Sequence, residues 1–339
     1  MHKYLLTATL LCLGFLLFPS VYGSVLQDTL ELKRVDNSEN KVLFYRVYAA
    51  KTTMELSKQD ISKLSMSTGA GRVIVKGTDS DVIQVEAEIV LSAKNIDRAA
   101  NIIQKFMVLS LEKEGGRASL KSHFDFHQRS DFAEAFNPNG FFSAPVRKID
   151  LVVKVPKEMA LSISDRSGDL SIEDMESNLA VTDRSGNIKI KNVQGDLKLD
   201  DSSGDIKLQD LNKNGNTNAV ISINDRSGVI HLDHVNGNIK LSDRSGDVAI
   251  KNTKGNIQLG DASGNLDIQK IDGDLKLVDA SGDIKARDIT GNITLDDNSG
   301  GIYVSNVAKD IHVYSAGTGD LKIRNYDGKL SGDLKRLYK

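Results

Sequence analysis

A charged tetrapeptide, Asp-Arg-Ser-Gly, contains the residues of this sequence whose types and spacing could do chemistry. It occurs at 165–168, 183–186, 225–228 and 243–246. Aspartate and serine two positions apart can hydrogen-bond the backbone of a tight turn, and glycine tolerates the positive φ that such a turn requires. The same carboxylates could instead line up as a calcium site or supply the acid and base of an enzyme. The pattern favours turn chemistry.

Calcium binding and catalysis are both poorly matched by this pattern. Secreted β-rolls with stacked calcium sites use G-G-x-G-x-D-x-U-x, and calcium prefers roughly six to eight oxygen ligands; neither feature occurs in this chain. A polysaccharide-acting β-helix enzyme needs one distinct acid and base pair, but carboxylates recur at the same coil position from Asp165 to Asp297. We therefore expect no catalytic, cofactor-binding or metal-ligating residue.

Arginines share the second position of the repeated turn and are candidate ligand-binding residues: Arg166, Arg184, Arg226 and Arg244. If their side chains point outward, coils about 4.8 Å apart would display a row of guanidinium groups. Such a row could bind phosphate or carboxylate groups of an anionic glycan with paired donors. The alternative is that each arginine pairs with the aspartate of its own turn, an exposed ion pair worth about 0 to 1 kcal/mol.

A phenylalanine-rich loop at about 127–147 provides a second set of candidate ligand-binding residues: Phe132, Phe136, Phe141 and Phe142. An exposed cluster of aromatic rings is typical of a partner-binding surface. The alternative is that the rings cover the flank of the fold, together with the nearby Phe124 and Phe126. The sequence leaves both interpretations open.

The elements that must position these residues follow from a repeat. Ser-Gly pairs from Ser167 to Ser299 recur every 18 residues, with a single interval of 24 where a polar insertion stands at 213–220. Apolar residues alternate with polar ones, which predicts two short strands per coil. Stacking would place Ile188 over Ile206. A β-propeller needs about 40 residues per blade. The sequence therefore predicts an all-β, single-stranded β-solenoid with 18-residue coils and one short helix.

The first residues resemble a secretory signal peptide, because Lys3 precedes an apolar segment at 5–18 that is too short to span a bilayer. We expect an exported chain that has no transmembrane segment after signal removal. The expected organisation is a signal peptide at 1–23, an amino-terminal cap at 24–59, irregular first coils at 60–156 with a helix at about 95–107, regular coils at 157–325, and a carboxy-terminal cap at 326–339.

The charge balance argues against a nucleic-acid partner. Lysine and arginine number 44 and aspartate and glutamate 46, so the composition indicates no strongly basic face. The single cysteine, Cys12, lies inside the expected signal peptide. The exported chain would therefore have no thiol for a disulfide or a thiolate metal site.

Two features resemble the Toastrack, or putative-adhesin, family of bacteria over roughly residues 60–325. They are the Val-Val-Lys-Val-Pro run at 152–156, which leads into Leu161-Ser-Ile163, and the repeated Ser-Gly-Asp and Ser-Gly-Asn turns. The resemblance implies a right-handed single-stranded β-solenoid and brings no catalytic residues. Some members are associated with envelope stress signalling, so the resemblance also leaves a sensor role open.

These observations predict an exported, non-catalytic β-solenoid that acts as an adhesin-like binding protein or a scaffold. We expect it in the periplasm or at the cell surface of a bacterium. The expected partner is an envelope glycan or another envelope protein. The alternatives are a component of an envelope-stress sensor and, less favoured, a polysaccharide-acting β-helix enzyme.

Overall fold

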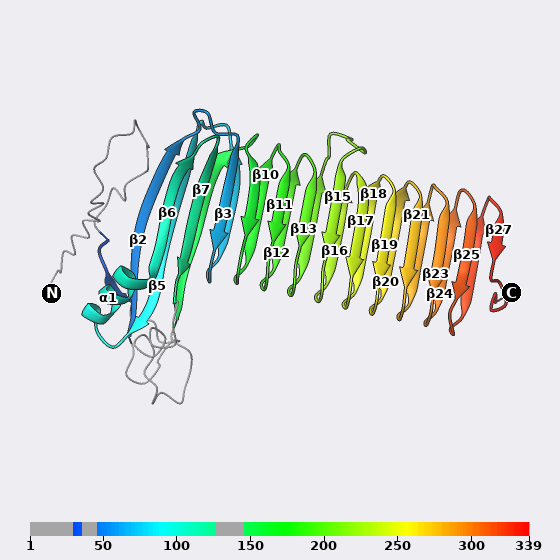
Figure 1. The fold of residues 1–339 in the computed structure, drawn as a ribbon. Coiled ribbons are helices and arrows are strands. Elements are labelled where there is room, and N and C mark those ends of the chain that lie inside the picture. Colours follow the sequence, from blue (N-terminus) through cyan, green and yellow to red (C-terminus); the bar gives the residue numbers. More distant parts are fainter. Residues whose placement is uncertain (1–29, 36–45, 127–145, 339) are drawn as a thin grey trace. The chain divides into compact units, whose positions relative to one another are not determined.

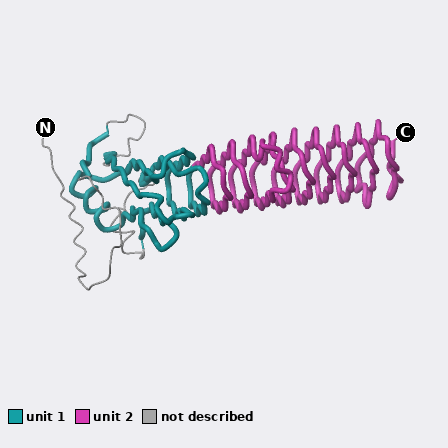
Figure 2. The backbone as a smooth tube through the Cα atoms, turned by 90° about the horizontal axis from the view of Figure 1, so that it is seen from above, with its two compact units in different colours: residues 1–168 teal, residues 169–339 magenta. Residues whose placement is uncertain are grey.

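The computed structural model describes residues 30–35, 46–126 and 146–338 (Figure 1). The chain divides into two compact units, which Figure 2 shows in teal and magenta. Unit 1 comprises residues 1–168 and unit 2 comprises residues 169–339.

Unit 2 consists of stacked coils whose strands form two parallel sheets (Figure 1). One sheet contains, in order, β10 (Leu170–Met175), β12 (Ile188–Val193), β14 (Ile206–Leu211), β16 (Ile230–Val235), β18 (Val248–Lys254), β20 (Leu266–Asp272), β22 (Ile284–Ile289), β24 (Ile302–Val307) and β26 (Leu321–Tyr326). The other contains β11 (Leu179–Thr182), β13 (Leu197–Asp200), β15 (Val220–Asn224), β17 (Asn238–Asp243), β19 (Ile257–Asp261), β21 (Leu275–Asp279), β23 (Ile293–Asp297), β25 (Ile311–Ala316) and β27 (Leu330–Gly332).

The register between coils places identical positions of the repeat over one another. Ile188 pairs with Ile206, and Leu179 pairs with Leu197. These aliphatic side chains are almost fully buried, whereas Lys189, between Ile188 and Ile190, is exposed. The predicted solenoid with coils of 18 residues is therefore confirmed, and its core is a stack of aliphatic side chains.

The glycine of each Ser-Gly pair is required by the distance between coils. A Cβ atom on Gly204 would lie 1.8 Å from the carbonyl oxygen of Gly186, and one on Gly246 would lie 1.7 Å from that of Gly228. Both glycines also have positive φ, 132° and 141°. Glycine is the only residue type without a Cβ atom, so any substitution at these positions would force neighbouring coils apart.

The polar insertion leaves the stacking intact. Residues 213–219 form a loop before β15, which Figure 1 shows extending beyond the neighbouring turns. Across this loop Leu197 pairs with Ile221, and Ile206 pairs with Ile230. The register therefore resumes after 24 residues instead of 18, as the sequence predicts.

Each coil of unit 2 contains a non-glycine residue with a left-handed backbone, with φ between 51° and 62°. These residues are Asp174, Asn192, Asp210, His234, Asn252, Lys270, Asp288, Asn306 and Asn325, and the coil of Asp210 has a second one, Asn212. Asparagine and aspartate tolerate this conformation better than other residues with a Cβ atom. In addition, Nδ2 of Asn192 donates a 2.7 Å hydrogen bond to Oδ1 of Asp174 in the neighbouring coil. Lys270 is not one of the residue types favoured in this conformation.

Unit 1 also contains two sets of strands, and antiparallel pairs occur in both. One set contains, in order, β1 (Lys33–Val35), β2 (Arg46–Ser57), β5 (Val82–Ala93), β8 (Arg147–Pro156) and β4 (Val73–Thr78); the other contains β9 (Ala160–Ser164), β3 (Lys63–Thr68), β7 (Arg117–Phe124) and β6 (Met107–Glu114). β3 pairs in parallel with β9, and β4 with β8, as in a coil. β5 differs from the coil expected at 60–156, because it runs antiparallel to β2 and β8.

The short helix lies where the sequence predicts it. α1 spans Ile96–Phe106, and Oδ1 of Asn95 caps it by accepting a hydrogen bond from the backbone N–H of Arg98 at 2.9 Å. Its buried side chains include Ala99 and Ile103. Across the described residues we find no helix with the length and hydropathy needed to traverse a lipid bilayer.

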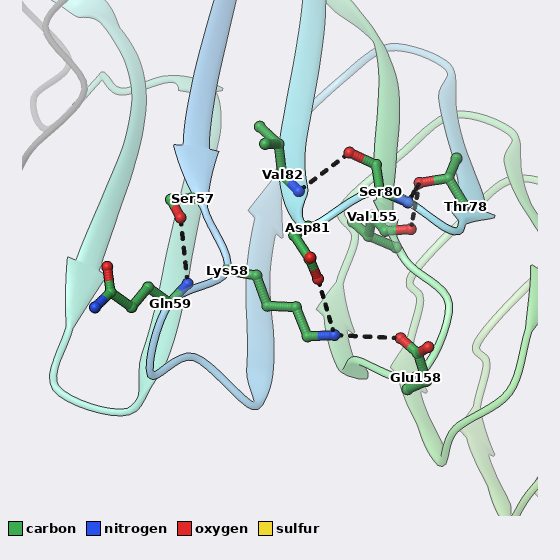
Figure 3. A network of polar contacts seen from close by, with 9 residues as sticks. All are labelled: Ser57, Lys58, Gln59, Thr78, Ser80, Asp81, Val82, Val155 and Glu158. Atoms are coloured by element: carbon green, nitrogen blue, oxygen red, sulfur yellow. Dashed lines mark hydrogen bonds and ion pairs between the residues drawn. The ribbon is translucent and has the colours of Figure 1, made fainter.

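Loops after β2, β4 and β8 meet in unit 1 through a network of polar contacts (Figure 3). Nζ of Lys58 lies 3.5 Å from Oδ1 of Asp81 and 3.4 Å from Oε2 of Glu158. Oγ1 of Thr78 donates to the carbonyl oxygen of Val155 at 3.2 Å. Exposed ion pairs of this kind contribute about 0 to 1 kcal/mol each, so they orient these loops more than they stabilise the unit.

The aliphatic stack can be tested with Ile206→Asp. Ile206 is fully buried, so the substitution would place an unpaired charge in the core, and we expect a loss of several kcal/mol of unfolding free energy. The matched control is Lys207→Asp on the same strand, where the side chain is exposed and the change should cost less than about 1 kcal/mol. Urea denaturation followed by circular dichroism measures both. Equal midpoints for the two variants would contradict this description of the core.

The left-handed positions predict a stabilising substitution, Lys270→Asn. Asparagine tolerates the φ of 56° at this position, so we expect a gain of about 0.5 to 1 kcal/mol. The control is Lys276→Asn on the exposed face of β21, which should be neutral or slightly destabilising because asparagine is disfavoured in strands. Thermal unfolding distinguishes the two. A lower melting temperature for Lys270→Asn would contradict the explanation.

Candidate functional site

The aspartates of the repeated turns are buried. They are between 0% and 6% exposed, and they are Asp165, Asp183, Asp201, Asp225, Asp243, Asp261, Asp279 and Asp297. In one turn, Oδ1 of Asp225 accepts hydrogen bonds from the backbone N–H groups of Arg226 at 2.6 Å and Ser227 at 3.2 Å. Asp243 makes the same pair of contacts in the next coil. The predicted turn chemistry is therefore confirmed.

The second carboxylate oxygen, Oδ2, has a different environment from Oδ1. Among the described residues, the buried Oδ2 atoms that have no hydrogen-bond partner include those of Asp201, Asp225, Asp243, Asp261, Asp279 and Asp297. Burial, together with the charges of neighbouring aspartates, raises the pKa of Asp201, Asp243 and Asp279 to about 6. The protonation of these carboxyl groups is therefore coupled to that of aspartates in adjacent coils.

Arg184, Arg226 and Arg244 of the same turns are exposed. Within the described residues, no ion pair is formed by Arg184, Arg226 or Arg244. In the turns of Arg226 and Arg244, Oδ1 of the aspartate is engaged by backbone N–H groups and its Oδ2 is buried. The guanidinium groups of these coils are left in solvent.

The arginines of unit 2 do not form a continuous row. The turns of Arg226 and Arg244 are adjacent, since the N–H of Gly228 donates to the carbonyl oxygen of Ser245 at 3.2 Å. Arg184 is separated from Arg226 by the coil of Ser202, so the two lie about 10 Å apart along the stack. The serine at position 202 is visible in the sequence and would have shown this interruption. Arg166 lies in unit 1 and is exposed.

We also searched the described residues for side chains that could hold a metal ion together. No group of three or more histidine, cysteine, aspartate or glutamate side chains in this part of the chain is placed to hold a metal ion. The stacked aspartates have one oxygen bonded to the turn backbone, so each could offer a cation only its buried Oδ2. This arrangement differs from the oxygen cages that calcium occupies.

Part of the chain matches a known protein family. Residues 121–272, called the Toastrack segment below, match the family described as Toastrack DUF4097. The matched region of the Toastrack segment contains the four arginine candidates and the phenylalanine-rich loop, and it ends within β20. No curated protein matches the chain.

Several solved structures are similar to this chain at low sequence identity. A putative cell adhesion protein from Clostridium sporogenes shares 11% identity over 65% of this chain and 99% of its own, with a TM-score of 0.35. A putative lipid binding protein from Parabacteroides distasonis shares 16% over 85% and 97%, with a TM-score of 0.29. A putative adhesin from Bacteroides fragilis shares 12% over 83% and 95%, with a TM-score of 0.28.

The phenylalanine candidates of the Toastrack segment lie outside the described residues, since Phe132, Phe136, Phe141 and Phe142 fall within 127–145. Phe126, just before this range, packs against Phe106 of α1 with ring centroids 4.8 Å apart. The guanidinium carbon of Arg147 lies 5.0 Å from the Phe126 ring centroid. For Phe126, the covering interpretation therefore agrees with the structure.

A second set of repeated polar residues has a structural role that the sequence analysis missed. The residue after each turn glycine is usually aspartate or asparagine, and it caps the backbone of the next coil. Oδ1 of Asp247 accepts from the N–H of Asn265 at 2.9 Å, and Oδ1 of Asn265 accepts from that of Asp283 at 3.1 Å. The recurring aspartate or asparagine after glycine was the signal that could have revealed it.

The buried aspartates of the repeated turns predict a pH dependence of stability. Their folded-state pKa is raised from 3.8 to about 6 at Asp201, Asp243 and Asp279, so the folded state binds more protons between these values. The protonated carboxyl groups therefore add to the free energy of unfolding. This stabilisation is fully present below about pH 4 and is lost as the pH rises through 6. We expect the unfolding free energy to fall between pH 5 and 7.5, by on the order of 1 kcal/mol per aspartate.

Urea denaturation at several pH values measures this effect. Asp279→Asn cannot ionise at this position and should reduce the slope, whereas Asp327→Asn on the exposed surface should leave it unchanged. A stability that rises from pH 5 to 7.5, with the same slope in both variants, would rule out the buried aspartates as its cause.

Proposed function

We propose that the protein is an exported, non-catalytic β-solenoid that binds a component of the bacterial cell envelope, as an adhesin-like protein or a scaffold, in the periplasm or at the cell surface. The observation that carries this proposal is the position of the repeated aspartates. The groups that would have to serve as acid and base are buried and bonded to turn backbone. They support the coils, which leaves the outward faces of the sheets as the surfaces that can meet a partner.

Binding is favoured over a purely mechanical role by the way the outward residues vary. The inward positions of the strands are uniformly aliphatic, as in Ile206 and Leu208. The outward positions change from coil to coil, from Lys189 in β12 to His231 in β16 and Asp267 in β20. The shape that a scaffold needs depends on the uniform inward positions. A ligand contacts the outward positions, and it can be recognised by the residues that vary there.

The proposal predicts that the chain without residues 1–23 retains an envelope component. Immobilised protein should enrich a glycan or a single protein from detergent-solubilised envelope, in a salt-sensitive manner because the exposed groups are charged. The variant with alanine at the four turn arginines, Arg166, Arg184, Arg226 and Arg244, should retain less of an anionic component. Its melting temperature should be unchanged, since exposed side chains contribute little to stability.

Two controls make this experiment decisive. Heat-denatured protein reports non-specific capture, and competition with a neutral glycan reports sugar recognition that does not depend on charge. Enrichment no greater than that of the denatured protein would contradict the binding proposal. Equal retention by the arginine variant would exclude the turn arginines as the site.

A further inference from the structure

A shallow cavity of about 340 Å³ lies on the outward face of the first sheet of unit 2, over β22, β24 and β26. Its polar lining consists of Lys285, Arg287, Tyr303, Ser305, Lys322 and Arg324. The register places Tyr303 between Lys285 and Lys322 in one row of the sheet. Ser305 has the same position between Arg287 and Arg324 in the next row. The cavity therefore has hydroxyl-bearing residues in its middle strand and cations on both sides.

The charge of this cavity is positive after its ion pairs are counted. Nη2 of Arg287 lies 2.8 Å from Oδ1 of Asp267, and Nζ of Lys322 lies 3.0 Å from Oδ2 of Asp320. Within the described part of the chain, Lys285 and Arg324 form no ion pair and both are exposed. These two groups are available to an anionic ligand.

Aromatic rings accompany these cations. Nζ of Lys322 lies 5.3 Å from the Tyr303 ring centroid and 5.4 Å from that of Tyr338. Tyr338 is 67% exposed, and its backbone N–H donates to the carbonyl oxygen of Leu321 at 2.9 Å, which fixes it beside β26. An aromatic face next to positive charge suits a ligand that has both C–H groups and negative charge.

The repeat is altered at two positions, Gly301 and Tyr303, and the change to glycine makes room for the tyrosine ring. The residue after the turn glycine is Gly301, where neighbouring coils have Asp283 and Asp320. A Cβ atom on Gly301 would lie 2.9 Å from Cε2 of Tyr303, so the ring occupies the space that an aspartate side chain would need. Turn capping is retained, because the N–H of Gly301 still donates to Oδ1 of Asp283 at 3.0 Å. The aromatic ring and the absent side chain belong together.

We propose that this cavity binds an acidic saccharide unit. Lys285 and Arg324 bind its carboxylate or phosphate group, with the guanidinium of Arg324 offering paired donors. The sugar ring lies against Tyr303. The hydroxyl of Ser305 donates a hydrogen bond to a sugar hydroxyl or accepts one from it. The volume is at the lower end of the range for small-ligand sites, which suits one or two sugar units. The inference rests on the proposed binding function and gives it a ligand class and a place.

Calorimetric titration of the chain without residues 1–23 tests the site with an oligogalacturonate probe. We expect binding that weakens with added salt, and no binding of a neutral malto-oligosaccharide of equal length. Lys285→Ala and Arg324→Ala should each reduce affinity about tenfold, which corresponds to one charge-assisted hydrogen bond. Tyr303→Leu should weaken binding while leaving the salt dependence unchanged. Melting temperatures of all variants confirm that they fold.

Matched controls separate this site from general attraction to positive charge. Lys189→Ala and Lys191→Ala remove cations at equivalent outward positions of β12 and should not change the affinity. Equal losses at β12, or equal binding of inorganic phosphate or single-stranded DNA, would overturn the saccharide assignment. If the Lys285 and Arg324 variants still enrich the envelope component although oligogalacturonate does not bind, this inference fails and the proposed function remains.

Discussion

The distance between successive coils is the constraint on which the rest of the structure depends. Parallel backbone hydrogen bonds set this spacing at about 4.8 Å, and the turns are packed so closely that a Cβ atom on Gly204 would lie 1.8 Å from the carbonyl oxygen of Gly186. Every coil must therefore have the same path at this corner. Extra residues are tolerated only where they leave the stack, as the loop at 213–219 does. The constant 18-residue interval follows from this requirement.

The same constraint determines what the repeated polar residues can do. A turn that cannot move away from its neighbours needs acceptors for its own N–H groups, and the aspartate of each turn supplies them through Oδ1. Its carboxyl group is then held inside the stack, where burial raises its pKa. A residue that recurs in every coil is thus engaged by the coil, and chemistry directed at a partner must come from residues that differ between coils.

The sequence predicted the features that depend on local pattern. Alternation of apolar residues gave the inward pairs such as Ile188 and Ile206, and Asn95 marked the start of α1. It could not predict the direction of β5, because the same alternation fits parallel and antiparallel neighbours. It also could not predict that, among the described residues, Arg226 and Arg244 form no ion pair, since whether a turn aspartate faces solvent or the backbone depends on how the turn is packed.

The cavity over β24 follows from the same reasoning. In a regular coil the residue after the turn glycine caps its neighbour and the next outward position is free to vary. At β24 both have changed: Gly301 has no side chain, and the Tyr303 ring fills the space above it. Asp283 still caps Gly301, whereas Gly301 has no side chain with which to cap the next coil. The two changes together place an aromatic face at this point of the sheet. The cations of β22 and β26 beside it then define which ligands that face can hold.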